Sequence, residues 1–377
     1  MTTDPLREPA KTMLYEAQSA IGARFGDVFG WEMALDFGDV LAEVRHARAS
    51  VGVVDLSYSG AILIGGKEGA QFLNGLVTNN VKTLENGKGL RAGFLTGHGK
   101  VKALCRILGL GDQFLVINDP QTHEKVLSYV QPFTYAGDFK AEEVSARYRV
   151  LSIQGPKSLS VMKEVCFEPV PALLENEWIG TIVAGHNVLV VSASHTGDPG
   201  YDILVPDEGV KDVWDFLMLK GEFHSIRPVG LKALDHLRIE AGIPVYGIDA
   251  DETNMMLEAG LEDAVSYSKG CYTGQEAVAM ATYRGHVSKK LSGLIVEGGL
   301  VPSAGASITR PDTGKEIGRI TSAIQSETLG KTIALGYVKY GMFEPGTTLN
   351  IALAEGKTSA TIVPLPFVHS QALVEGI

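Results

Sequence analysis

The segment from Lys269 to Glu276, which reads Lys-Gly-Cys-Tyr-Thr-Gly-Gln-Glu, concentrates reactive side chains: an ammonium, a thiol, an amide and a carboxylate. Its two glycines allow backbone conformations that other residues avoid and let a ligand approach the backbone closely. In an extended segment Lys269 and Cys271 share a face, and a nearby ammonium favours the thiolate form of a cysteine. The segment predicts either a loop with a functional thiol or a turn with an ordinary buried cysteine, and both interpretations stay open at this point.

The composition is that of an ordinary globular protein, with 45% hydrophobic and 20% charged residues, and 377 residues suffice for two or three domains. The net charge of −11 argues against a general nucleic-acid binder, which needs a basic face. A local basic patch for an anionic cofactor tail is compatible with this charge, and the alternative for the same run is a solvated linker. The run comprises Arg284, His286, Lys289 and Lys290.

The cysteines and histidines indicate neither disulfides nor a metal site. Cys105, Cys166 and Cys271 are too few and too irregularly spaced for a disulfide framework or a zinc motif. The nine histidines show no paired ligand spacing, so we expect no metal site built by the protein. This cysteine usage fits a reducing compartment.

The chain shows no sequence signal for a membrane or for secretion. Residues 1–14 contain acids and prolines without an apolar run, which is not typical of a signal peptide. No apolar stretch reaches the ~20 residues that a membrane-spanning helix needs. We therefore expect a cytoplasmic protein with no membrane partner.

Apolar periodicity predicts alternating strands and helices over the first 290 residues. Two units look alike, each a strand, a turn and a helix, which suggests an internal duplication. In the second unit, Pro156 suits a first helical position. Asp119-Pro120 reads as the cap and first residue of a helix through Val130. The remaining expected elements are an irregular region with a short helix over 15–29, helices over 39–49, 70–77, 210–217 and 231–241, and strands over 60–65 and 150–153.

From Leu291 onward the character of the sequence changes. Short β-rich runs alternate with turn signals, such as Pro311-Asp312-Thr313-Gly314, and no long helix-period segment occurs. This pattern predicts a small β-barrel. We therefore expect an N-terminal region over 1–289, made of two α+β subdomains, and a C-terminal barrel domain over 290–377.

The octapeptide resembles the signature of the YgfZ-type folate-binding proteins, which assist iron–sulfur cluster assembly and repair and are relatives of the glycine-cleavage T-protein, an aminomethyltransferase. Further stretches that look like T-protein landmarks are Gly30–Met33, Val54–Ser57, Leu76–Asn79, Arg238–Gly242 and Ile317–Ser322. The resemblance implies an α+β fold, with folate-binding subdomains around a central channel and a C-terminal β-barrel. It also implies tetrahydrofolate, or a one-carbon derivative of it, as the cofactor.

The resemblance also shows where T-protein chemistry is altered. Aminomethyl transfer needs a carboxylate near the reacting nitrogen. T-proteins have two aspartates in a Gly-Gly-Val-Ile-Asp-Asp stretch, and the matching positions here are Ala103 and Leu104. Asp112 is the nearest acid in that strand neighbourhood, and it lies too far along the chain to substitute. This departure argues against ordinary aminomethyl transfer and leaves open whether the protein is an enzyme.

The folate site that the resemblance implies is partly kept. In His195–Asp202, Asp202 matches the glutamate that bonds the pterin in T-proteins, and His195 stands where a ring-stacking tyrosine would stand. A carboxylate offers the pair of acceptors that a 2-amino-pyrimidinone edge requires. Without the resemblance, Asp202 would read as a surface acid in a hairpin. The residues expected to bind the cofactor are Asp202, His195, Tyr201, Asn79, Lys269, Gln275 and Arg284.

Three functions follow from these features. The first is a tetrahydrofolate-binding protein that helps build or repair iron–sulfur clusters, with Cys271 as its catalytic residue and iron–sulfur assembly proteins as partners. The second is a folate-dependent aminomethyltransferase or methyltransferase. The third is a non-catalytic interaction scaffold that reuses the fold. The missing aspartates favour the first over the second, and folate binding separates both from the third.

Overall fold

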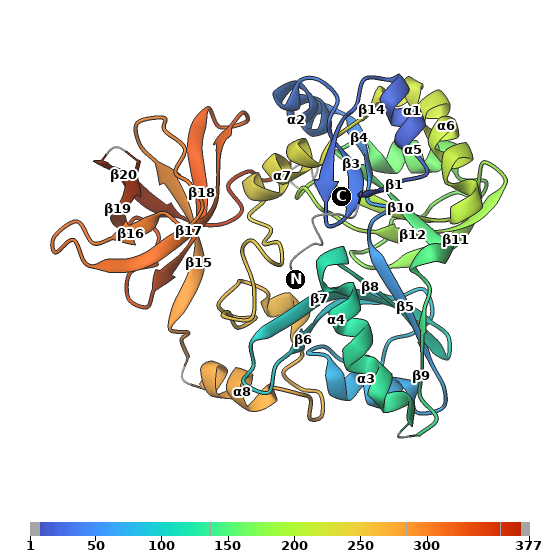
Figure 1. Cartoon of the computed structure of the whole chain (residues 1–377), viewed down its shortest axis with the longest axis horizontal. Coiled ribbons are helices and arrows are strands. Elements are labelled where there is room, and N and C mark those ends of the chain that lie inside the picture. The colour runs from blue at the N-terminus through green and yellow to red at the C-terminus, as the bar shows by residue number, and fades with distance from the viewer. Residues whose placement is uncertain (1–7, 136, 284, 355, 371–377) are drawn as a thin grey trace.

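The structure, a computed structural model, describes residues 8–135, 137–283, 285–354 and 356–370. Figure 1 shows a closed barrel on the left and two sheets on the right, one above the other in this view. A cluster of apolar side chains, among them Val54, Leu108, Leu115 and Leu204, joins strands of the two sheets. This α+β architecture with a C-terminal barrel confirms the predicted fold class.

The lower sheet in Figure 1 has the strand order β6-β7-β8-β5-β9 and is antiparallel throughout. Along β7, Val101, Ala103, Cys105 and Ile107 are buried while the alternate residues are partly exposed, as expected for a strand with one face in the core. The elements of this unit are β5 (Gly60–Gly65), α3 (Gly69–Leu76), β6 (Gly89–Leu95), β7 (Val101–Leu110), β8 (Gln113–Asn118), α4 (Pro120–Val130), a 3-10 turn (Gln131–Tyr135) and β9 (Lys140–Glu143).

The upper sheet has the order β11-β12-β13-β10-β4-β14, and only β14 runs parallel to its neighbour β4. Every residue of β4 is buried, which explains its nearly continuous apolar sequence. The elements are β4 (Val51–Asp55), β10 (Tyr148–Gln154), α5 (Ser158–Val165), β11 (Trp178–Val183), β12 (His186–Ser192), β13 (Gly200–Pro206), α6 (Val210–Gly221) and β14 (Ile226–Pro228).

The two sheets repeat one topology. In each, a strand and a helix are followed by three consecutive antiparallel strands, the last of which pairs with the first strand of the unit. Both turns after the first strand use a glycine at positive φ, Gly66 at 92° and Gly155 at 127°, which other residues rarely adopt. The shared order supports the predicted duplication. The expectation for Pro156 is wrong, because α5 begins only at Ser158 and is preceded by Lys157 at the cap.

The N-terminal region contains more strand than expected. Between residues 15 and 29, a short helix is followed by β2. The sequence did not indicate this strand, because its apolar and polar residues do not alternate regularly. Asp39 caps the next helix by accepting hydrogen bonds from the backbone amides of Leu41 and Ala42, both at 3.0 Å. The elements are β1 (Ala10–Lys11), α1 (Tyr15–Ala20), β2 (Arg24–Val28), β3 (Trp31–Asp36) and α2 (Val40–Ala49).

The barrel closes in the order β15-β18-β17-β16-β19-β20. Its interior is apolar, with Leu294, Ile308, Ile351 and Ala360 fully buried. The division of the chain at 289/290 stays a proposal. The strands are β15 (Lys289–Val296), β16 (Ser307–Thr309), β17 (Glu316–Ser326), β18 (Lys331–Lys339), β19 (Thr348–Leu353) and β20 (Gly356–Val363).

A buried polar network joins the barrel to α7 (Leu231–Glu240). The Asp249 carboxylate pairs with the Arg238 guanidinium and accepts hydrogen bonds from Thr321 at 2.5 Å and Ser322 at 2.7 Å. The Asp249 side chain is fully buried, and that of Arg238 is 5% exposed. The buried pair of Arg238 and Asp249 therefore holds the barrel to the N-terminal region. Removal of either charge would leave the other buried without it.

Candidate functional site

Asp202 lies on β13 and is held by two neighbours. Its carboxylate accepts a hydrogen bond from the Ser152 hydroxyl at 2.6 Å and lies 3.0 Å from Nε2 of His195. Burial by itself raises the pKa of Asp202, but the charge and hydrogen bond of His195, the charge of Arg106 and the Ser152 hydroxyl bring it below its ordinary value. Asp202 is therefore an ionised carboxylate, and the interpretation as a surface hairpin acid does not hold.

Asp119 is the second acid of the site, and the sequence did not reveal it. It was predicted as a helix cap, and α4 does begin at Pro120, but the Asp119 side chain makes no capping hydrogen bond. Burial raises its pKa to about 6, although the charges of His195 and Arg91 oppose the shift. Two carboxyl groups thus interact with one imidazole, and their pKa values are shifted in opposite directions.

The strand register explains why Asp119 was missed. Cys105 on β7 pairs with Asn118 on β8, so the next residue, Asp119, lies at the end of β8 beside Leu104. Asp112, which we had judged the nearest acid, lies exposed in the turn between the two strands. Asp119 thus approaches the position of the lost aspartate pair from the neighbouring strand. Knowledge of the β7–β8 pairing is the signal that would have found it.

The positions of the lost pair themselves offer no acid–base group. Ala103 is fully buried in the core of the lower sheet, and Leu104 packs against a second apolar cluster. On the same face as Leu104, Arg106 donates a hydrogen bond to the Ser192 carbonyl at 3.0 Å, and the Lys102 ammonium lies 3.9 Å from the Tyr129 ring centroid. This face of β7 therefore carries cations and an apolar side chain.

Lys269 does not act on the Cys271 thiol as expected. Its ammonium donates to the carbonyls of Asn74 at 2.5 Å, Val77 at 2.7 Å and Asn79 at 2.7 Å. These three bonds use all its donor hydrogens. Burial lowers the pKa of Lys269 to about 7, while the carbonyl acceptors favour its protonated form. The residue thus fastens the octapeptide to the end of α3, and the prediction that it stabilises a thiolate is corrected.

The remaining predicted site residues are dispersed. Tyr201 points into the core of the upper sheet and is 5% exposed, because neighbours in a strand face opposite sides, so its predicted role at the cofactor is wrong. The Asn79 amide donates to the Arg91 carbonyl at 2.9 Å and so supports the strand that carries Arg91. Gln275 begins α8 (Gln275–Tyr283), and its role stays a prediction. Arg284 lies outside the described residues.

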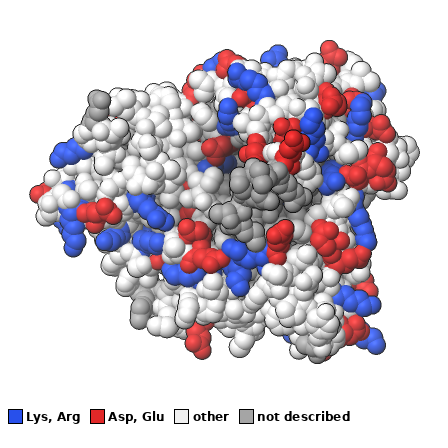
Figure 2. Space-filling model, in the orientation of Figure 1, with Lys and Arg blue, Asp and Glu red and all other residues white. Residues whose placement is uncertain are grey.

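The described part of the basic run has neighbours of its own. The Lys290 ammonium lies 3.5 Å from the Glu262 carboxylate, and the His286 ring stacks on Tyr340 with centroids 4.1 Å apart. Figure 2 shows basic and acidic side chains interspersed where the barrel meets the rest of the molecule. A patch dedicated to an anionic cofactor tail is therefore not the arrangement seen.

The Cys271 side chain is exposed, which excludes the interpretation as a buried cysteine, whereas Cys105 and Cys166 are buried. Burial raises the pKa of the Cys105 thiol and raises that of Cys166 to about 12. We expect iodoacetamide to modify Cys271 at least about tenfold faster than either buried thiol, because alkylation needs an accessible thiolate. Peptide mass spectrometry over a time course measures the three rates, and equal rates would contradict the assignment. The catalytic role of Cys271 stays a prediction.

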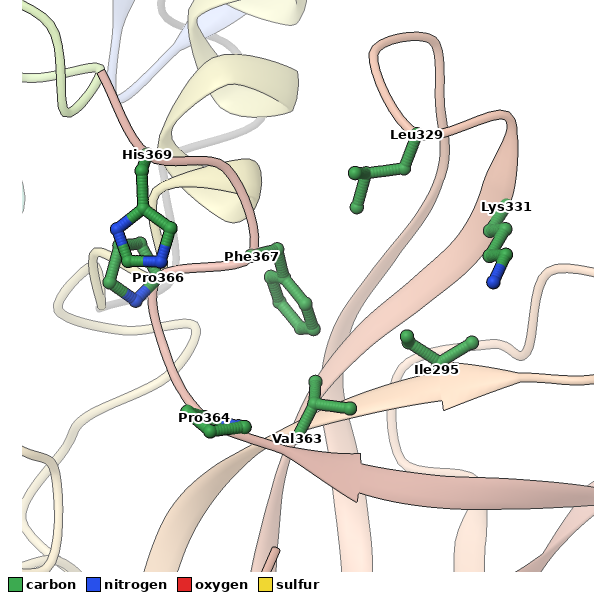
Figure 3. Close-up of a pocket in the computed structure, with 8 residues that line it drawn as sticks. All are labelled: Ile295, Leu329, Lys331, Val363, Pro364, Pro366, Phe367 and His369. Carbon is green, nitrogen blue, oxygen red and sulfur yellow. The ribbon is translucent and has the colours of Figure 1, made fainter. Parts of the chain in front are cut away.

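A cavity of about 410 Å³ lies at the side of the barrel. Figure 3 shows Phe367 in it, with Lys331 and His369 at its edges. Its lining contains no aspartate or glutamate, so it offers no carboxylate for proton transfer. We take as the candidate site the group formed by Asp119, His195 and Asp202, in which the charge of His195 acts on both acids.

Two further features are absent from the described residues. No group of three or more His, Cys, Asp or Glu side chains is placed to hold a metal ion within the described ranges. Among the helices described here, none has the length and apolar character to cross a membrane.

Comparisons with known proteins cover nearly the whole chain. The family model for the GCVT N-terminal domain matches residues 14–269, and that for the glycine cleavage T-protein C-terminal barrel domain matches residues 289–369. An aminomethyltransferase of Halothermothrix orenii is 32% identical over 360 residues, which are 95% of this chain and 99% of the relative. One of Corynebacterium jeikeium is 30% identical over 385 residues, 96% of this chain and 99% of the relative.

A solved structure shares the fold. The glycine cleavage system aminomethyltransferase T from Bartonella henselae superposes with a TM-score of 0.88 at 24% identity, over 96% of this chain and 98% of that one.

These relatives overturn the first of the three predicted functions. We had expected assistance in iron–sulfur cluster assembly, but full-length relatives at 30–32% identity are named aminomethyltransferases. The inference failed because it treated Ala103 and Leu104 as the loss of the site acid. Asp119 approaches the same place from β8, so that substitution does not leave the site without a carboxyl group.

Proposed function

We propose that this chain, which belongs to the glycine cleavage T-protein family, catalyses the tetrahydrofolate-dependent transfer of a one-carbon unit from an aminomethyl donor. One arrangement carries the proposal: the Asp202 carboxylate lies 3.0 Å from Nε2 of His195, and the charge of the same imidazole acts on Asp119, so that the pKa values of the two acids are displaced in opposite directions. Such a displacement separates the group that exchanges protons from the group that stays charged.

The donors and acceptors of the site fit tetrahydrofolate. The 2-amino-pyrimidinone edge of a pterin presents N–H donors, which an ionised carboxylate matches. Asp202 is such a carboxylate, and its side chain is 11% exposed. Ser152 and His195 occupy only part of the roughly four acceptor positions of a carboxylate. We therefore propose that Asp202 and His195 hold the cofactor.

The three residues of the site have different chemical roles. Tetrahydrofolate, when bound, supplies the nitrogen that accepts the one-carbon unit. The Asp119 carboxylate would act as general base and take up the proton that this nitrogen loses, because a pKa of about 6 leaves it mostly ionised yet basic near neutral pH. Asp202 remains ionised over the same range and orients the N–H donors beside it. The charge of His195 favours the ionised form of both acids.

A finer placement within the family rests on the sequence alone. We propose that the octapeptide from Lys269 to Glu276 marks a YgfZ-type branch of the family. The support is its resemblance to that signature, together with the apolar residues at 103 and 104. This placement concerns ancestry, and the proposed activity does not depend on it.

A reconstituted transfer assay tests the activity. The purified protein is mixed with tetrahydrofolate and an aminomethyl-lipoyl donor, and ammonia and methylene-tetrahydrofolate are measured. We expect both products to form together and to require tetrahydrofolate. If tetrahydrofolate binds but no ammonia is released, the protein is not an aminomethyltransferase. If tetrahydrofolate does not bind, the fold serves a non-catalytic role.

Replacing Asp202 with asparagine is expected to weaken tetrahydrofolate binding at least about tenfold, because charge-assisted hydrogen bonds contribute about 1.5–3 kcal/mol. Isothermal titration calorimetry measures the affinity. The matched control is Asp212→Asn, since Asp212 also lies 3.0 Å from a histidine, His186, but on the surface. Unchanged affinity in Asp202→Asn would remove this residue from the site.

A further inference from the structure

The side chain of Gln154, at the end of β10, connects several parts of the candidate site. It is 1% exposed. Its amide nitrogen donates to the Ser152 hydroxyl at 2.9 Å and to the Ala193 carbonyl at 2.8 Å. Its amide oxygen accepts from the backbone N–H of His195 at 2.9 Å, and the Thr196 hydroxyl lies 3.4 Å from it. One buried amide thus spans β10 and the loop before β13.

The partners of Gln154 determine which way its amide points. The carbonyl of Ala193 can only accept a hydrogen bond, so the amide nitrogen must face it. The backbone N–H of His195 can only donate, so the amide oxygen must face that group. A flipped amide would bring its oxygen against the Ala193 carbonyl and its nitrogen against the His195 N–H. Two buried donors would then face each other unpaired, as would two buried acceptors, which costs free energy.

Two of the partners of Gln154, Ser152 and His195, also hold Asp202. Ser152 donates its hydroxyl hydrogen to Asp202 at 2.6 Å, and the His195 ring lies 3.0 Å from that carboxylate. Ser152 and His195 come from different segments of the chain, and Gln154 contacts both. A shift of its amide would therefore move both groups relative to Asp202.

Gly200 provides the space for this amide. It pairs with Gln154 across the two strands, and a Cβ atom added there would lie 2.3 Å from the amide nitrogen and 2.4 Å from the amide oxygen. Such distances are far below van der Waals contact. Gly200 is not among the glycines with positive φ, so its backbone conformation does not itself demand glycine.

We propose that Gln154 is the positioning residue of the site and that Gly200 is a glycine because the Gln154 amide occupies the place of its side chain. The inference rests on the proposed function only in that His195 and Asp202 are taken as the cofactor-binding pair. Gln154 acts through these residues: it sets the distance and angle between the imidazole and the carboxylate. The geometry of the pair, and not only the stability of the fold, depends on it.

The test measures the ring resonances of His195 by NMR at a fixed pH in the protein without folate or donor, so its outcome is independent of any transfer activity. A His195→Asn variant assigns the signal. In Gln154→Met, which keeps the length of the side chain without its hydrogen bonds, we expect the His195 ring resonances to shift, because the imidazole moves relative to the Asp202 carboxylate. The surface pair of His186 and Asp212 is the internal control and should not move.

Gly200→Ala perturbs the same amide without changing Gln154, so it covers the case in which Gln154→Met does not fold. We expect it to shift the His195 ring resonances as well. In a Gln154→Ser background the clash is gone, so adding Gly200→Ala should cause no further shift, a non-additivity that identifies the contact. Unchanged His195 ring resonances in folded Gln154→Met and Gly200→Ala would overturn the inference. Full tetrahydrofolate affinity in both variants would do the same.

Discussion

Replacing Asp119 with asparagine should lower the rate of one-carbon transfer by about 10²–10⁴-fold, which is the usual contribution of a positioned acid–base group. The amide cannot take up a proton near neutral pH. The folded state raises the pKa of Asp119 above its ordinary value, so it favours the protonated form, which asparagine resembles. We therefore expect the variant to fold at pH 7 and to bind tetrahydrofolate.

The ionisation of Asp119 should also make the transfer rate depend on pH. Because the ionised form is the base, the transfer rate of the unmodified protein should rise with pH through about 6 and then level off, and this limb should be missing in Asp119→Asn. Asp112→Asn is the matched control, since Asp112 lies exposed at the other end of the β7–β8 hairpin. A variant at Asp119 that keeps most of its rate and the same pH limb would exclude this residue as the base.

Removing the Asp249 carboxylate should destabilise the protein by about 3–5 kcal/mol, the usual cost of breaking a buried ion pair by deleting one partner. Asp249→Ala leaves the Arg238 guanidinium buried without this carboxylate. It also takes from Ser322 its carboxylate acceptor and leaves Thr321 with the Leu335 carbonyl at 3.2 Å. Urea denaturation followed by circular dichroism measures the loss.

The control for this second prediction is an exposed ion pair within the barrel domain. Arg310 and Asp312 lie 2.8 Å apart on the surface, and solvent screens their attraction. Asp312→Ala should therefore leave the unfolding curve unchanged. A small loss in Asp249→Ala, no greater than that in Asp312→Ala, would show that the buried network does not hold the barrel in place.

An acid lost from one strand can be replaced from the neighbouring strand. Ala103 and Leu104 lack acid–base groups, as the sequence indicates. The replacement acid lies across the sheet and not along the same strand. In an antiparallel hairpin, the residues nearest the start of β7 lie at the end of β8, about 15 positions later in this case. Asp119 is therefore near Leu104 in space although it is distant in sequence.

Local signals were sufficient for most of the helices, but for few of the strands in the two sheets. The β5 strand, the start of α4 at Pro120 and the end of α7 before Gly242 follow from apolar periodicity, cap residues and turn glycines. The change of pattern after Leu291 likewise predicted the barrel strands. β2 was not predicted, since its apolar and polar residues do not alternate regularly.

The sequence by itself therefore determined most of the helices, the C-terminal barrel and the fold family, and it singled out Asp202, because each depends on neighbours a few residues away or on a contiguous motif. Only the tertiary structure decided what the charged groups do. It turned the Lys269 ammonium toward three carbonyls and placed Tyr201 in the core. It also placed Asp119 where burial and the charge of His195 act on its carboxyl group. The protonation of an acid depends on burial and on charges a few ångströms away, and those neighbours come from strands paired across the sheets.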